Sequence, residues 1–537
     1  MSILTYIAGW PLLAALALVV VPRNYRVVIR AIAVLATLTS AVLAVKLFCG
    51  YGCAAPDAEG YRFVQQIPWV ESLGISYHVG VDGLNVGLIL MGAIVAFAAA
   101  LCSWEIQTRE KEFYILLLVM AGGILGAFAS LDLFFFYFLH ELALVPTFIM
   151  IGIWGRGEKK NYATFQITLY LSIGALIALL GLIALYLQSG ARTFDIPKII
   201  EHVRANPLAP GAQNVIFPLL LFGFGILVSL WPFHSWAPLG YGVAPSPTAM
   251  LHAGVLKKFG LYGLIRIALP LLPQAAQNWA HVIAWLCVGN ILYVGWVAMR
   301  QKDLNLLIGN SSVAHMGFIF LGIASLNLIG VTGAVLIMVA HGFLAALTFA
   351  LSGYLYQQTG TLQIRELGGL CRQLPFIGAA LLMAAMAGCG LPGFANFVGE
   401  AAVFFGAWKV FPAITVFALW GALVIGGIYM TRAIRNILHG PLPEKWTSLA
   451  DANLWRKVPY ALLLVSLLVF GFVPRLLTEK INPDAQKIVD LANRQAGASA
   501  SAVVSSASLL ASDLAAAARG KAPGTPVVPV NVVVQNQ

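Results

Sequence analysis

The sequence predicts an all-α polytopic membrane protein with about 14 transmembrane helices, each able to cross a ~30 Å hydrocarbon core. Of its 537 residues, 60% are apolar and only 10% are charged, whereas soluble domains carry about 25% charged residues. Basic residues also gather in alternate loops between the apolar stretches. These observations exclude a soluble enzyme, a disordered protein and a nucleic-acid binder, although the net charge is +11.

Two of the predicted spans are interrupted. One contains Pro232 within Leu230–His234, and the other contains Pro392 within Gly388–Gly393. Proline breaks a helix, and in lipid a break is tolerated only where neighbouring helices or water satisfy the freed backbone groups. The spans lie near residues 3–22, 27–48, 82–103, 113–130, 132–153, 163–188, 214–238, 247–270, 279–299, 306–327, 329–356, 376–406, 411–437 and 458–477.

The spans divide the chain into five regions. Residues 1–80 hold two spans and an extracytoplasmic loop, 81–275 hold spans 3–8, and 276–440 hold spans 9–13. Residues 441–478 hold a cytoplasmic loop and span 14. Residues 479–537 are rich in Ala and Ser, and we expect a mobile tail, weakly helical or mobile over 485–518 and disordered over 523–537.

The charge of the loops predicts the orientation. Loops that include Arg23, Arg156 and Arg300 are rich in basic residues, and the opposite loops hold fewer. Because basic loops stay in the cytoplasm, we expect both termini to be extracytoplasmic. Cys49 and Cys53 are the only cysteines close in sequence. They form a disulfide if their loop faces an oxidising compartment, and otherwise are two unconnected small residues.

Three ionisable residues within the apolar stretches are candidate proton carriers: Glu141, Lys258 and Glu400. A charge at mid-membrane costs several kcal/mol unless it is neutral, paired or hydrated. We therefore expect Glu141 to face the bundle interior; the alternative is a structural carboxylate bonded to a neighbouring helix. Glu400 follows the second interruption, where helix ends and unpaired backbone can handle ions.

Further basic groups lie in the same segments. Adjacent helical residues point about 100° apart, so only one of Lys257 and Lys258 can face along a given path. Histidine can accept a proton near neutral pH, although a lone buried histidine is more often a satisfied core residue. We expect Arg266 to anchor a helix end. The possible relay residues are His140, His234, His252, Lys257, His315 and His341.

The sequence contains no phosphate-binding glycine loop, no cysteine cluster and no histidine pair at haem-like positions. We therefore expect neither a cofactor nor a metal in this chain, and no redox chemistry of its own.

Four motifs, at residues 141–155, 232–238, 311–318 and 390–400, lie within roughly residues 75–475. Each motif is weak alone, but four in this order and at this depth are specific. Together they resemble the antiporter-like membrane subunits of proton-translocating NADH:quinone oxidoreductase, respiratory complex I. The glutamate that ends the last motif is similar to that of the M-type (chain 4) subunits.

The resemblance implies two inverted five-helix repeats, spans 4–8 and 9–13, each with one broken helix. It implies that Glu141, Lys258 and Glu400 transfer protons. It also implies paralogous membrane-arm subunits as partners in the lipid bilayer of a bacterial inner membrane. Quinone reduction, flavin and iron–sulfur clusters belong to partner subunits, and this chain would couple that reduction to proton transfer.

The sequence departs from the family pattern in span 7, where Leu227 stands at the position of a lysine. One hypothesis is that Lys257 or His252 on span 8 supplies the lost charge. The rival hypothesis is a structural paralogue kept for assembly, with weakened pumping. Two other functions use the same module: a subunit of a cation/proton antiporter, and the membrane arm of an energy-converting hydrogenase.

Overall fold

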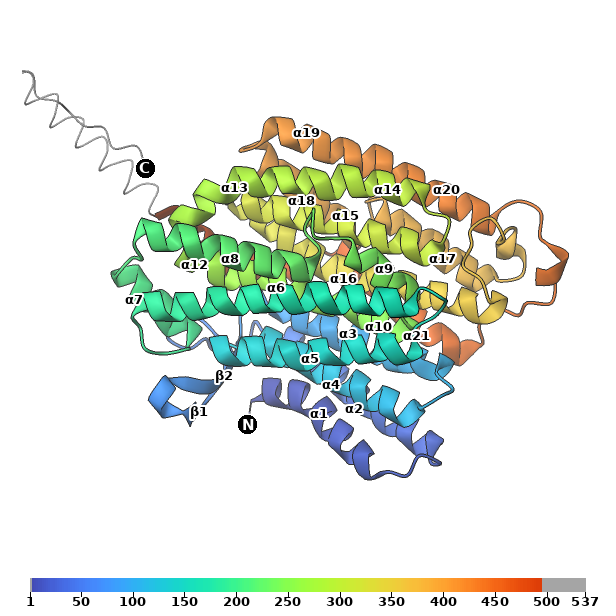
Figure 1. Cartoon of the computed structure of the whole chain (residues 1–537), viewed down its shortest axis with the longest axis horizontal. Coiled ribbons are helices and arrows are strands. Elements are labelled where there is room, and N and C mark those ends of the chain that lie inside the picture. The colour runs from blue at the N-terminus through green and yellow to red at the C-terminus, as the bar shows by residue number, and fades with distance from the viewer. Residues whose placement is uncertain (1, 495–537) are drawn as a thin grey trace, which may run out of the picture. The chain divides into compact units, whose positions relative to one another are not determined.

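The computed structural model describes residues 2–494, and helices form nearly all of its regular structure (Figure 1). By contact, the chain separates into one compact unit, Met1–Ala492, which is described here, and a second unit, Asn493–Gln537. Within the described residues, 12 helices are long and apolar enough to cross a membrane. The predicted polytopic helical fold is therefore confirmed.

These helices lie side by side in the bundle (Figure 1). Three of them are continued or interrupted by short 3₁₀ or π turns, which do not break the span. Their bounds are α1 (Ile3–Val20), α2 (Arg26–Gly50), α3 (Val86–Cys102), α4 (Glu110–Ala129), α5 (Leu133–Trp154), α6 (Lys160–Ser189), α8 (Pro210–Val228), α13 (Pro273–Val288) continued by α14 (Val294–Arg300), α15 (Leu304–Ala324), α16 (Leu328–Thr359), α19 (Pro412–Trp420) continued by α20 (Gly427–Leu438), and α21 (Leu454–Phe472).

The two other predicted spans are made of shorter pieces. The span predicted near 247–270 consists of α10 (Ser246–Leu251), α11 (Lys258–Gly263) and α12 (Leu269–Leu271), joined by π-helical turns at His252–Leu256 and Leu264–Ala268. The span predicted near 376–406 consists of α17 (Pro375–Gly388) and α18 (Ala395–Trp408). Both predicted interruptions are confirmed, since α8 stops at Val228 before α9 (Trp236–Val243) begins.

Helix α16 forms the centre of the bundle. The most apolar window of α16 is completely buried, and the helix packs against α15, α18, α3 and α21. The outer helices α1, α6 and α21 instead leave large apolar side chains exposed, among them Leu16, Leu187 and Phe472. Such a surface suits contact with lipid or with other membrane subunits.

One end of the bundle carries non-spanning elements. Strands β1 (Arg62–Val70) and β2 (Ile75–Val81) form an antiparallel hairpin with Gln66 opposite His78, where the sequence analysis expected only a loop. The short helix α7 (Ile196–Ala205) lies at the same end (Figure 1). Cys49 and Cys53, which precede this hairpin in the chain, are free, exposed thiols.

The start of the predicted tail differs from expectation. Residues 475–494 form one helix, which includes the predicted boundary at 479. Leu477, Ile481, Ala485 and Ile488 are buried along one face of it, because this 3–4-residue spacing places them on a single stripe. The prediction of a mobile tail is therefore wrong for 479–492, and the rest of that tail, 495–537, lies outside the described residues.

Candidate functional site

A row of buried ionisable side chains connects α11 to α18. The Lys258 side chain is completely buried, and its Nζ lies 2.9 Å from Nδ1 of His341 on α16. The rings of His341 and His315, on α15, have centroids 5.3 Å apart. Nε2 of His315 then lies 3.6 Å from Oε1 of Glu400 on α18. Four of the predicted site residues are therefore neighbours, although they come from four different helices.

The π-helical turn His252–Leu256 positions the lysine end of the row. In this turn the Lys257 N–H donates to the carbonyl of His252, five residues earlier, at 3.0 Å. The carbonyl of Ala253 accepts from Nζ of Lys258 at 2.5 Å. A buried ammonium without a partner is costly, so this carbonyl stabilises the charged lysine. Turns of this kind often occur at functional sites.

Lys257 faces a different set of partners. Its Nζ lies 3.5 Å from Oγ of Ser312 and 5.6 Å from the ring centroid of Tyr241. The hydroxyl of Tyr241 is in turn 3.0 Å from Nδ1 of His252. As expected from their helical spacing, the two lysines point to separate neighbours. No contact between Lys257 and Glu141 occurs in the described structure.

The second interruption shapes the surroundings of Glu400. Gly390 has a φ of +66°, and a Cβ at this position would collide with Oε2 of Glu400. Three buried groups here form no hydrogen bond among the described residues: Nε2 of His315, Oε1 of Glu400 and the side-chain amide of Asn396.

A small cavity lies beside two of these groups, His315 and Glu400. It is lined by His315, Cys389, Glu400 and Tyr429, and leaves about 10 Å³ for water centres, which is about what one water molecule needs. Buried polar groups are normally hydrogen-bonded to protein or to water. Nε2 of His315 and Oε1 of Glu400, which are 3.6 Å apart, can therefore be linked by one bridging water. A small side-chain movement would instead bring them into a direct hydrogen bond.

The first interruption is stabilised by Asn290, which the sequence analysis missed. Its Oδ1 accepts from the Trp231 N–H at 2.7 Å. Its Nδ2 donates to the carbonyls of Ser229 and Val313, both at 3.0 Å. Asn290 lies on the π-helical turn Gly289–Tyr293 between α13 and α14. An amide from the next span thus satisfies backbone groups that the break leaves unpaired. Leu227, one residue before the end of α8, is buried.

Glu141 lies at the edge of the bundle, which corrects the expectation that it faces the interior. Its side chain is 30% exposed, and Oε1 lies 3.2 Å from Nδ1 of His140. Phe138 and Val145, on the same side of α5, are also exposed. The expectation assumed that residues of this chain must cover the Glu141 carboxylate. A second chain that packs against the exposed side of α5 can cover it instead.

His140, the partner of Glu141, packs on an aromatic ring of α11. The imidazole of His140 stacks on Phe259, with centroids 3.9 Å apart, and Phe259 directly follows Lys258 in α11. His234 also lies outside the row. Its Nδ1 is 3.2 Å from the carbonyl of Pro232, and its ring packs edge-on against Tyr293.

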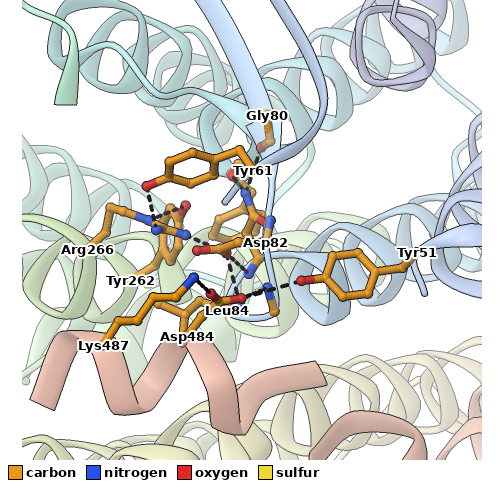
Figure 2. A network of polar contacts seen from close by, with 12 residues as sticks. Tyr51, Tyr61, Gly80, Asp82, Leu84, Tyr262, Arg266, Asp484 and Lys487 are labelled. Atoms are coloured by element: carbon orange, nitrogen blue, oxygen red, sulfur yellow. Dashed lines mark hydrogen bonds and ion pairs between the residues drawn. The ribbon is translucent and has the colours of Figure 1, made fainter. Parts of the chain in front are cut away.

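Arg266 anchors the far end of the α10–α12 segment, as expected. Figure 2 shows its buried guanidinium donating to Oδ1 of Asp82 at 2.6 Å and to the hydroxyls of Tyr262 and Tyr61, at 3.0 Å and 3.2 Å. Burial raises the pKa of Tyr61, so its hydroxyl stays protonated. This network holds the segment against the turn that follows β2.

The helix 475–494 joins the same region. Oδ2 of Asp484 accepts from the Gly83 N–H at 2.8 Å, and Oδ1 accepts from Lys487 at 2.8 Å (Figure 2). In the part of the chain that the structure describes, no group of three or more His, Cys, Asp or Glu side chains is arranged to hold a metal ion.

The sequence is similar to known membrane subunits. The profile of the family described as NADH:quinone oxidoreductase/Mrp antiporter, TM, matches residues 130–426. The chain is 35% identical to NAD(P)H-quinone oxidoreductase chain 4 1 of Picosynechococcus sp., over 88% of this chain and 89% of the relative. It is 32% identical to NADH-quinone oxidoreductase subunit M of Rhodobacter capsulatus, over 91% of this chain and 96% of the relative.

Solved structures agree with the fold. A chain of respiratory complex I from Thermus thermophilus superposes with a TM-score of 0.82 and 28% identity, covering 91% of this chain and 99% of that one. A chain of the Mrp complex from Dietzia sp. superposes with a TM-score of 0.78 at 19% identity, over 90% of this chain and 99% of that one. The second likeness concerns the fold alone.

Proposed function

Because the chain belongs to the NADH:quinone oxidoreductase/Mrp antiporter transmembrane family, we propose that it is a proton-translocating membrane-arm subunit of an NADH-quinone oxidoreductase. The observation that carries this proposal is the buried row Lys258, His341, His315 and Glu400. All four side chains can gain or lose a proton. They come from four different helices, and the local sequence of each helix does not require these side chains to lie together.

The row is suited to proton transfer by its distances. A donor and an acceptor 2.6–3.2 Å apart, or joined by one water, can exchange a proton. Lys258 and His341, at 2.9 Å, meet this condition directly. His315 and Glu400, at 3.6 Å, meet it through one water or a small movement. His341 and His315 between these pairs have ring centroids 5.3 Å apart and share no hydrogen bond in the described structure, so transfer between them needs a ring rotation or a bridging water. With that step, the row can pass a proton sideways through the bundle when the charge of a neighbour changes.

The proposal assigns the redox chemistry to other subunits. Flavin, iron–sulfur clusters and quinone would bind to partner chains, and this chain would respond to the reaction electrostatically. Glu141 on the exposed flank of α5 is where a paralogous membrane-arm subunit would meet this one. On this proposal the loops with Arg156 and Arg300 face the cytoplasm of a bacterium, and the N-terminus lies outside.

A structural paralogue with weakened pumping is the second candidate. It is supported by Leu227 at the position of the family's lysine and by the packing of His140 on the Phe259 ring. If neither a proton nor an electrostatic effect passes between Glu141 and Lys258, a proton would reach the row only slowly from the α5 side. This candidate predicts a subunit needed for assembly of the complex, whose ionisable residues can be replaced without effect on pumping.

The two candidates are separated by replacing Lys258→Met in the intact oxidoreductase reconstituted into vesicles. We expect fewer protons moved per NADH oxidised, while electron transfer to quinone with an uncoupler present is retained. Lys409→Met is the matched control, because Lys409 is exposed and should leave the ratio unchanged. An unchanged ratio in both variants would support the structural paralogue. An antiporter would instead purify without flavin and iron–sulfur subunits.

A further inference from the structure

A cavity of about 430 Å³ opens between the ends of α2, α3, α16 and α21. None of the residues of the buried row lines it. Its deeper wall is apolar and is formed by Val34 and Leu38 of α2, with Phe97, Leu101 and Cys102 of α3. A volume of this size lies within the range of ~300–1,000 Å³ that is usual for small-molecule sites.

The mouth of the cavity is polar. Gln357 at the end of α16, and Asn453 and Arg456 at the start of α21, line it there. Trp104 and Trp455, which are 47% and 79% exposed, border the same opening. Tryptophan at the ends of spans marks the level of the lipid headgroups. The cavity is therefore apolar where the hydrocarbon lies and polar where the headgroups lie.

Arg456 at the mouth is a cation without an anionic partner. Among the described residues it forms no ion pair, and its guanidinium lies 5.9 Å from the ring centroid of Tyr354. The nearby carboxylate of Glu105 is already engaged by Arg156 at 3.3 Å and by Gln357 at 3.1 Å. A guanidinium is the side chain best suited to bind a phosphate group with two parallel hydrogen bonds.

We propose that this cavity binds one anionic phospholipid of the surrounding bilayer, with an acyl chain against α2 and α3 and the phosphate on Arg456. The apolar wall requires a hydrocarbon chain, which a free phosphate ion lacks. A zwitterionic headgroup would bring a second cation beside Arg456, where the carboxylate of Glu105 is already paired with Arg156 and that of Asp451 accepts from the Phe376 N–H. This site is separate from the proton-transfer row, so it does not depend on the proposed function.

Cys102 provides a direct readout, because it lines the cavity and carries a free thiol. The full-length chain in detergent is treated with a small maleimide after addition of phosphatidylglycerol, phosphatidylcholine or inorganic phosphate. Modification is then quantified for each cysteine by peptide mass spectrometry. We expect phosphatidylglycerol to slow modification of Cys102 at least fivefold. The exposed Cys49 is the internal control and should react at the same rate under all conditions.

Two adjacent cations give matched variants. Arg456→Gln should abolish the protection of Cys102, whereas Lys457→Gln should retain it, because Nζ of Lys457 lies 5.0 Å over the ring of Phe376 on α17. A third variant, Leu101→Trp, fills the apolar part and should reduce the phosphatidylglycerol retained in native mass spectrometry. Equal protection by phosphatidylcholine or by phosphate would overturn the proposal, as would protection that survives Arg456→Gln or no protection by any lipid.

Discussion

Nζ of Lys258 lies 2.9 Å from Nδ1 of His341, although both side chains are basic and both are completely enclosed by protein. A hydrogen bond between two nitrogen atoms needs one donor and one acceptor, so the pair holds the proton on one side at a time. The carbonyl of Ala253 favours the lysine side through its 2.5 Å contact. A change in charge near His315 or Glu400 can therefore move this proton along the row.

Gly390→Ala should disturb the end of the row without replacing an ionisable residue. Gly390 has a left-handed φ of +66°, and an added Cβ would collide with the Glu400 carboxylate. We expect Glu400 to move away from His315 and the protons moved per NADH to fall severalfold. Gly360→Ala is the matched control, because Gly360 has a similar left-handed φ of +71° and a Cβ there would meet nothing within 4 Å. Equal pumping by the two variants would contradict this role of Gly390.

Lys257→Met tests whether the charge absent at Leu227 has moved to span 8. Lys257 contacts Ser312 and Tyr241 in place of Glu141, so we expect a smaller loss of protons per NADH than with Lys258→Met. The measurement is proton uptake by vesicles that contain the intact complex. Lys257→Arg, which keeps the positive charge, should recover part of the loss. Unchanged pumping in Lys257→Met would remove the relocation hypothesis.

Asp132→Asn should change how stability depends on pH. Asp132 caps α5 by accepting from the Phe134 and Phe135 N–H groups, and burial raises its pKa from 3.8 to about 6. The folded state then binds this proton more tightly than the unfolded chain does. The contribution of Asp132 to the free energy of unfolding therefore falls by roughly 3 kcal/mol as the pH rises from about 4 to about 6.

Asparagine keeps the capping oxygen and cannot titrate. The thermal midpoint of Asp132→Asn should therefore decline less than that of the wild type over this pH range. Glu158→Gln is the control, since it removes one carboxylate from an exposed position that forms no ion pair among the described residues. If Asp132→Asn and the wild type show the same slope, Asp132 does not carry this proton in the folded state.

The members of the row were predictable from the sequence because ionisable residues are rare in its apolar stretches. Lys258, His315, His341 and Glu400 each stand out for that reason, and the prolines near 232 and 392 indicated both breaks. Which spans pack together was not predictable from local pattern. The pairing of Lys258 with His341 depends on how α11 lies against α16. The pairing of Lys257 with Ser312 depends on how the same segment lies against α15.

The π-helical turns, the β hairpin and the exposure of Glu141 were not predicted from the sequence. The π-helical turns that set the directions of Lys257, Lys258 and Asn290 leave no trace in an apolar profile. The alternating apolar residues of β2, Ile75, Tyr77, Val79 and Val81, are typical of a strand, but the sequence analysis assigned β1 and β2 to a loop. The exposure of Glu141 depends on whether another subunit covers α5. The sequence of one chain does not show which subunits pack against it.

The most direct measurement of the central claim is a double-mutant cycle on the two histidines of the row. His315→Gln, His341→Gln and the double variant are compared for protons moved per NADH in vesicles that contain the intact complex. Glutamine keeps a hydrogen-bonding side chain but does not carry a proton. If protons pass along one row, each single variant pumps less and the double variant loses no more than the worse single variant. Losses that multiply in the double variant, or pumping that is unchanged in either single variant, would contradict a single path from Lys258 to Glu400.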